Sequence, residues 1–294
     1  MRRTLRDDDQ EEALVRDGYV VVPLLDDEAM SELLAGFAEL EPADRFDPPG
    51  GSPTNPTTYH CTFLDTDRAY KVAFDELVRR IFGPLIDDLF ESPRLLTANC
   101  YAKQPGKGDF EVHQNWTLTT DPSDLTVTVW VPLHDTIAAN GTLAVIPGSH
   151  KLTVDIAYPR GDHYFSDYDD VLARDHFVPL ELRAGEVVLF ADDLIHGSQR
   201  NVTDTPRFAL QVAVIPASAR PVVWYPVDED SFALLDAPGE FYLATTLAEI
   251  DSWPARFGTV ATAANRNRRL PLEAFEERLE AGRRVRAELW GWPE

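Results

Sequence analysis

The sequence predicts a mainly β protein with flanking helices, in which short strands form a sandwich or barrel. From about residue 95 onward, apolar residues recur with a period of two in several short segments. Turn signals such as Asn140-Gly141 and Ala184-Gly185 separate these segments. No internal repeat with a period of about 20–50 residues is visible, which disfavours solenoids and propellers. Short strands with even turn spacing are instead typical of sandwiches and barrels.

Residues 1–93 are expected to support the strands with one short strand and two helices. The segment "GYVVVP" has the composition of a strand, and an amphipathic helix follows it with Asp26 or Asp27 as N-cap. A second helix is predicted over about residues 67–91, with a break near Gly83-Pro84.

Residues 94–218 are expected to form the core of a barrel, and residues 219–294 a last strand, "PVVWYP", followed by helices. The predicted core strands are "LLTANCYAKQ", "LTVTVWVPL", "GTLAVIPGS", "VPLELRAGEVVLFADD" and "RFALQVAVIP". The aromatic and charged insertion 152–176 suits a lid over a cavity. The pattern of 271–291 is typical of a surface helix.

Composition limits the classes of partner. The formal charge of −23 disfavours nucleic acids and anionic membranes, because both would repel this chain. Two cysteines without metal-site spacing favour a reduced, intracellular protein. The N-terminus lacks the apolar core of a signal peptide, and no apolar run approaches the about eighteen residues of a membrane helix. We therefore expect a cytoplasmic protein, monomeric or homodimeric.

Two histidines and an arginine form the strongest candidate site. His113 lies in the strand-like stretch "FEVHQNWTLTT", with Asn115 two positions later on the same face. His196 follows the strand of "GEVVLFADDLIHGSQ", and Arg207 begins the next strand. Two imidazoles and a third ligand on one face of Fe(II) leave the opposite face open for a chelating co-substrate and dioxygen. The arginine offers a bidentate fork for a carboxylate of that co-substrate.

The sequence resembles the phytanoyl-CoA dioxygenase family of Fe(II)/2-oxoglutarate-dependent oxygenases over most of its length. The resemblance lies in "DGYVVVPLLDDEAMSELLAGF", "VHQNW", "TVWVPLHDTIAANGTLAVIPGSHK" and "GEVVLFADDLIHGSQRNVTDTPRFALQVAVIP". It implies a single double-stranded β-helix domain over residues 1–294, that is, a jelly-roll or cupin-like barrel. It also implies Fe(II) and 2-oxoglutarate as cofactors. His113 and His196 would be metal ligands, while Arg207 and Ser198 would bind the 5-carboxylate of 2-oxoglutarate.

Further residues are expected near this site from their positions on neighbouring strands and loops. Candidates for lining the co-substrate pocket are Tyr101, Lys103, Thr128 and Trp130, of which Trp130 could equally be core. Candidates for contacting the substrate are Trp116, His60, Arg160, His163 and Tyr164. Asp192 and Asp193 have the pattern of turn or edge residues and are not expected to be ligands.

Asn115 departs from the family pattern, which has aspartate at this position. An amide oxygen can bind a metal, but the anionic charge is lost and the metal is expected to bind more weakly. Asn115 could bind through its oxygen, or leave the metal to the histidines and the co-substrate. Asp109 or Glu111 could instead supply a substitute carboxylate. The chain could also be a catalytically impaired binding protein, or carry a halogenase-like site.

The resemblance implies oxidation of a C–H bond by dioxygen, as hydroxylation or a related reaction. The ionic groups of the insertion 152–176 favour a small polar substrate, and an intermediate of specialised metabolism fits this expectation.

Overall fold

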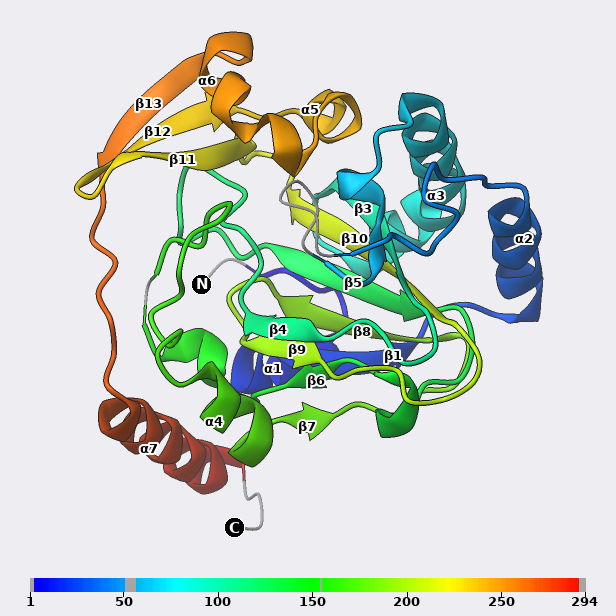
Figure 1. The fold of residues 1–294 in the computed structure, drawn as a ribbon. Coiled ribbons are helices and arrows are strands. Elements are labelled where there is room, and N and C mark those ends of the chain that lie inside the picture. Colours follow the sequence, from blue (N-terminus) through cyan, green and yellow to red (C-terminus); the bar gives the residue numbers. More distant parts are fainter. Residues whose placement is uncertain (1–2, 51–56, 154, 291–294) are drawn as a thin grey trace.

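Two antiparallel sheets form the centre of the computed structural model, which describes residues 3–50, 57–153 and 155–290 (Figure 1). The six-stranded sheet has the order β1 (Tyr19–Pro23), β8 (Glu186–Ala191), β5 (Val127–Pro132), β10 (Arg207–Pro216), β3 (Pro93–Lys103) and β2 (His60–Cys61). The four-stranded sheet has the order β4 (Phe110–His113), β9 (His196–Ser198), β6 (Ala144–Val145) and β7 (Val178–Pro179). The prediction of a mainly β protein with flanking helices is confirmed.

One hydrophobic cluster joins the two sheets. Trp130, Val188 and Phe190 contribute from the six-stranded sheet, and Val145 contributes from the four-stranded sheet. The alternate residues of β5 and β8 face the opposite way and pack in a second cluster together with residues of the N-terminal helices. The six-stranded sheet is therefore buried on both faces, and only its inner face can contribute to a site between the sheets.

The N-terminal helices are α1 (Asp8–Asp17), α2 (Asp27–Ala38) and α3 (Arg68–Leu89). The Asp26 side chain accepts from the Ala29 N–H at the start of α2, so the predicted cap is confirmed. Helix α1 was not predicted, although Asp7 caps it in the same way. The predicted break at Pro84 is wrong, because α3 continues through it. The buried apolar face on both sides of this proline outweighs the missing hydrogen bond.

The C-terminal part contains more strand than the sequence indicated. Its sheet has the order β11 (Val222–Asp228), β12 (Ser231–Asp236) and β13 (Thr259–Ala264). The prediction of one last strand followed only by helices is therefore wrong. The remaining helices are α4 (Asp169–Asp175), α5 (Gly239–Ala244), α6 (Trp253–Arg256) and α7 (Leu272–Trp290). Within the described part of the chain, no helix is long and apolar enough to cross a membrane.

Candidate active site

Antiparallel pairing of β4 with β9 brings His113 and His196 together (Figure 1). The two residues are opposite each other in the register, and their ring centroids are 4.1 Å apart. Each Nδ1 lies 2.8 Å from a backbone carbonyl two residues earlier, that of Glu111 for His113 and that of Leu194 for His196. These contacts place a hydrogen on Nδ1 and leave the Nε2 lone pair available, as a metal ligand requires.

Both imidazoles are neutral at neutral pH. Burial lowers the pKa of His196 to about 4. Burial also lowers the pKa of His113 well below its ordinary value, and the neighbouring His196 lowers it further. The neutral imidazole is the form that binds a divalent metal, so the pair is suited to this role.

Arg207 lines a narrow cavity together with both histidines. Its side chain is 2% exposed, and Nη2 donates to the Gly141 carbonyl at 2.9 Å. Nε and Nη1 have no hydrogen-bond partner among the described residues. Burial lowers the pKa of Arg207 to about 10, so the guanidinium remains charged near neutral pH. A buried guanidinium with two unused donors is suited to bind an anion.

Lys103 is a second buried basic residue close to Arg207. It pairs with Arg207 across β3 and β10 and is fully buried. Its Nζ donates to Ser198 Oγ at 2.6 Å and to the carbonyls of Ser198 and Gln199. Burial lowers the pKa of Lys103 well below its ordinary value, and the nearby Arg207 lowers it further. Within the described ranges Arg207 forms no ion pair, and Lys103 supports the cavity through Ser198 without lining it.

Asn115 belongs to a cluster of hydrogen-bonded polar side chains near the two histidines. Its Nδ2 donates to Thr128 Oγ1 and to Asp192 Oδ1, both at 2.9 Å. Thr128 Oγ1 in turn donates to the same Asp192 oxygen at 2.7 Å. Gln211 Nε2 lies 3.3 Å from Thr128 Oγ1 and completes the group. Burial raises the pKa of Asp192, whereas hydrogen bonds from Thr126, Thr128 and Asn115 lower it.

A larger cavity of about 440 Å³ adjoins the narrow one, and both are lined by His113 and Asn115. Aromatic side chains make up much of its wall: Tyr59, Phe63, Tyr101, Phe110, Trp116, Tyr158 and Tyr242. Arg160 and His163 from the predicted lid segment also line it. A cavity of this size, next to candidate metal ligands, can hold a small molecule.

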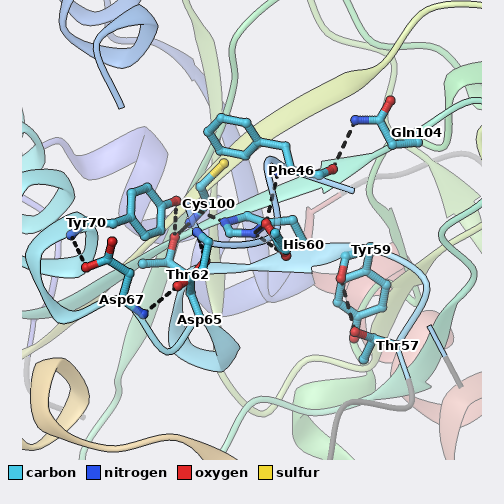
Figure 2. Close-up of polar contacts among 12 residues, drawn as sticks. Phe46, Thr57, Tyr59, His60, Thr62, Asp65, Asp67, Tyr70, Cys100 and Gln104 are labelled. Carbon is cyan, nitrogen blue, oxygen red and sulfur yellow. Dashed lines mark hydrogen bonds and ion pairs between the residues drawn. The ribbon is translucent and has the colours of Figure 1, made fainter. Parts of the chain in front are cut away.

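Two residues expected to contact the substrate lie elsewhere. His60 is fully buried, with Nδ1 2.8 Å from the Asp44 carboxylate and Nε2 2.9 Å from the Tyr70 hydroxyl (Figure 2). Tyr164 is 3% exposed and packs in a hydrophobic cluster with Phe275 of α7. Neither residue lines the larger cavity. The structure therefore gives both a role in packing, and α7 is partly buried rather than a plain surface helix.

The acidic residues near His113 are arranged differently from the expectation. Asp109 forms an exposed ion pair with Arg200 at 2.6 Å. Glu111 is exposed and lines only the larger cavity. The carboxylate closest to Asn115 is that of Asp192, for which the sequence indicated only a turn or edge position. Asp192 lies between β8 and β9, four residues before His196, and this proximity to a candidate ligand was the available signal.

Trp130, Tyr101 and Ser198 all line the narrow cavity. The Arg207 guanidinium carbon lies 5.8 Å from the centre of the Trp130 ring, so this tryptophan contacts the cation as well as the core. Tyr101 lines both cavities and stands between them. Seven of the nine positions expected for the metal and co-substrate thus line one cavity. The other two do not: Thr128 lines the larger cavity, and Lys103 lines neither.

A family model and several curated relatives match parts of this chain. A phytanoyl-CoA dioxygenase (PhyH) family model matches residues 14–209. Phytanoyl-CoA dioxygenase 1 of Oryza sativa subsp. japonica is 37% identical over 143 residues, which are 46% of this chain and 50% of the relative. A phytanoyl-CoA dioxygenase domain-containing protein 1 of Danio rerio is 30% identical over 172 residues, covering 52% and 57% of the two chains. The chain thus spans about half the length of these curated relatives.

Solved structures share the fold at lower identity. The non-heme alpha ketoglutarate dependent carbocyclase SnoK from nogalamycin biosynthesis is 20% identical, with a TM-score of 0.50 and coverage of 73% of this chain and 86% of SnoK. EctD from S. alaskensis, solved with 2-oxoglutarate and 5-hydroxyectoine, is 22% identical, with a TM-score of 0.50 and coverage of 73% and 78%. The family match over residues 14–209 includes His113, His196 and Arg207, and the chain belongs to the phytanoyl-CoA dioxygenase family.

Proposed function

We propose that this protein is an Fe(II)/2-oxoglutarate-dependent oxygenase that oxidises a C–H bond of a small molecule. The observation that carries this proposal is the buried Arg207, whose Nε and Nη1 have no partner among the described residues. It lines the same narrow cavity as the two neutral imidazoles. Burying a cation without a counter-ion is costly, so the cavity is suited to an anionic ligand that also reaches a metal.

Each residue has a defined part in this proposal. His113 and His196 would hold the metal through Nε2, and their Nδ1 contacts fix the two rings. Arg207 would bind the distal carboxylate of 2-oxoglutarate through its two unused donors, with the Ser198 hydroxyl beside it. Lys103 orients Ser198 through the hydrogen bond from Nζ to Oγ. The bound iron and 2-oxoglutarate supply the oxidising chemistry, and the chain positions them and excludes water.

The two facing sheets, joined by a common cluster, support assignment of the centre as a double-stranded β-helix. In that arrangement β4 and β9 bring both histidines to one end of the barrel, and β10 brings the arginine. The solved structures with the same fold support this assignment.

The substrate would occupy the larger cavity beside His113 and Asn115. Its wall is more aromatic than the small polar substrate predicted from the insertion would require. We therefore propose a small molecule with a ring or other apolar portion, and with polar groups near Arg160 and His163. Residues 152–176 contribute to this wall, as expected of a lid.

A non-catalytic binding protein is the second candidate, because Asn115 supplies no negative charge to the metal. Such a protein would still bind a dicarboxylate through Arg207. A halogenase-like site is less well supported, since the Asn115 side chain fills its place and is fixed by two hydrogen bonds.

Anaerobic addition of Fe(II) and 2-oxoglutarate tests the first candidate. Chelation of the metal by the co-substrate gives a weak visible charge-transfer band, and exposure to air should then release succinate. A band without succinate would favour the binding protein. Absence of both the band and 2-oxoglutarate binding would refute the proposal.

A further inference from the structure

The protein groups that face the candidate metal carry no negative charge. His113 and His196 bind a metal as neutral imidazoles through Nε2, since each Nδ1 hydrogen is directed at a backbone carbonyl. Asn115 has an amide in place of a carboxylate. A divalent cation held only by neutral groups in a buried site lacks compensating protein charge, and this arrangement is unfavourable. A nearby carboxylate would offset this cost.

Asp192 is a carboxylate fixed directly against Asn115. Its side chain is 4% exposed, and Oδ1 accepts from Asn115 Nδ2 at 2.9 Å. The two backbones are joined as well, since the Asn115 N–H donates to the Asp192 carbonyl at 2.9 Å. Thr128 Oγ1 donates to the same carboxylate oxygen at 2.7 Å. A contact made by both backbone and side chain leaves little freedom to either residue.

These contacts also determine which way the Asn115 amide faces. Nδ2 is committed to Thr128 and Asp192, so Oδ1 lies on the opposite edge of the amide. Asn115 lines the narrow cavity that contains both imidazoles, whereas Asp192 does not. The amide oxygen is therefore the Asn115 atom available to that cavity, and Asp192 lies behind it.

The remaining acidic residues nearby are not placed for this role. Asp109 is paired with Arg200, and Glu111 is exposed. In the described part of the chain, one group of at least three His, Cys, Asp or Glu side chains has ligand atoms close enough to share a metal ion. It consists of Asp44, His60 and Asp65, away from the histidine pair, and His60 is already bonded at both ring nitrogens.

We propose that Asp192 is the charge partner of the metal site and acts through Asn115. It holds the amide oxygen toward the two imidazoles, and it supplies the negative charge one hydrogen bond away from the metal. The hydrogen bond from the amide N–H to a carboxylate also increases the electron density on the amide oxygen. Asp192 is thus a positioning residue, and this inference rests on the proposed metal-dependent function.

Titration of the metal-free full chain with Ni(II), followed by calorimetry, tests this proposal without turnover. Asp192→Asn keeps the shape and one acceptor oxygen but removes the charge, and we expect Ni(II) to bind roughly 10–100-fold more weakly. Asp193→Asn is the matched control at about pH 8, where Asp193, whose pKa burial raises to about 7, is ionised, so that the same charge is removed one residue further along the chain. We expect it to bind Ni(II) as the wild type does.

The double variant Asn115→Asp/Asp192→Asn places the carboxylate at position 115, on the side of the imidazoles. It also exchanges donor and acceptor in the hydrogen bond between the two side chains. We expect it to regain at least the wild-type affinity for Ni(II). Asn115→Asp alone should gain much less, because it places two carboxylates in contact. Non-additive effects of the two substitutions on Ni(II) affinity would distinguish this role from a general loss of stability. A changed Co(II) absorption spectrum in Asp192→Asn would do the same.

Each outcome bears on a different claim. Wild-type Ni(II) affinity in a folded Asp192→Asn variant would overturn the role of Asp192 and leave the proposed function intact. Additive effects of the two substitutions would also overturn it, and this comparison remains informative if the single variant is unstable. Absence of Ni(II) binding by the wild type would refute the proposed function and this inference together.

Discussion

Replacing Arg207 by methionine separates its proposed role in binding from a role in folding. Methionine keeps a long side chain but removes the charge and all donors. If Nε and Nη1 bind the carboxylate of 2-oxoglutarate, two charge-assisted hydrogen bonds are lost, each worth about 1.5–3 kcal/mol. A total of about 3–6 kcal/mol corresponds to affinity roughly 100-fold to 10,000-fold weaker, since about 1.4 kcal/mol is tenfold.

The same substitution should weaken ligand binding without lowering the stability of the ligand-free protein. Arg207→Met gives up one hydrogen bond to the Gly141 carbonyl, worth about 1 kcal/mol. It also removes a buried cation that forms no ion pair, which relieves a desolvation cost of similar or larger size. We therefore expect the free energy of unfolding without ligand to be unchanged or higher. A purely structural arginine would instead lose stability when it is replaced.

Calorimetric titration of 2-oxoglutarate in saturating Ni(II), together with denaturant unfolding of the ligand-free chain, measures both effects. Arg200→Met is the matched control, because Arg200 is exposed and pairs only with Asp109 at the surface. Wild-type affinity for 2-oxoglutarate in Arg207→Met would refute the assignment of the carboxylate site. A loss of several kcal/mol in the ligand-free protein would show that the guanidinium serves the fold.

Three further predictions follow from the same charges and contacts. His60→Leu should cost about 2–3 kcal/mol of unfolding free energy by removing its two buried hydrogen bonds, to Asp44 and Tyr70, yet leave Ni(II) affinity unchanged in the same calorimetric titration. Burial raises the pKa of Asp155 to about 7, so the folded protein favours the protonated carboxyl group. The contribution of this group to stability therefore falls as the pH rises from its pKa in the unfolded chain toward 7. Asp155→Asn should therefore stabilise the protein by on the order of 1–3 kcal/mol at about pH 8 but little at about pH 4, and equal effects at both would contradict this reasoning. Ni(II) and 2-oxoglutarate should each raise the affinity for the other by the same factor, since the protein ligands are neutral and the co-substrate is a dianion; independent binding would argue against a shared site.

The parts of the fold that were predictable are those in which one local pattern dominates. Strands β5, β8 and β10 are nearly continuous apolar segments, and Asp26 is a well-placed cap for α2. The break predicted at Pro84 is wrong, because proline disfavours a helix locally whereas packing of apolar side chains stabilises α3 on both sides of it. Strand β13, "TVATAA", is too small and exposed to show an alternating pattern, and only its pairing with β12 defines it.

The candidate site was predictable where residues lie on strands of the two central sheets, and not where a contact joins distant loops. His113, His196 and Arg207 are marked by strand position and by the surrounding motifs. The contact between Asn115 and Asp192 joins residues 77 positions apart, and no local pattern in "FADDLIHGS" indicates which aspartate turns inward. His60 shows the converse, because its loop position suggested a pocket rim while Asp44 and Tyr70 hold it in the interior.

The net charge of the chain differs in sign from the charge at the narrow cavity. The chain carries a formal charge of −23, yet the narrow cavity is lined by Arg207, which is paired with no acid in the described structure. In the proposed function this cation favours the dianionic co-substrate, while Asp192, which is hydrogen-bonded to Asn115, favours the metal. The co-substrate and the metal would thus be attracted to different ends of one cavity. Loss of the carboxylate at position 115 is compatible with such a site, because the charge balance depends on the whole cavity rather than on a single ligand.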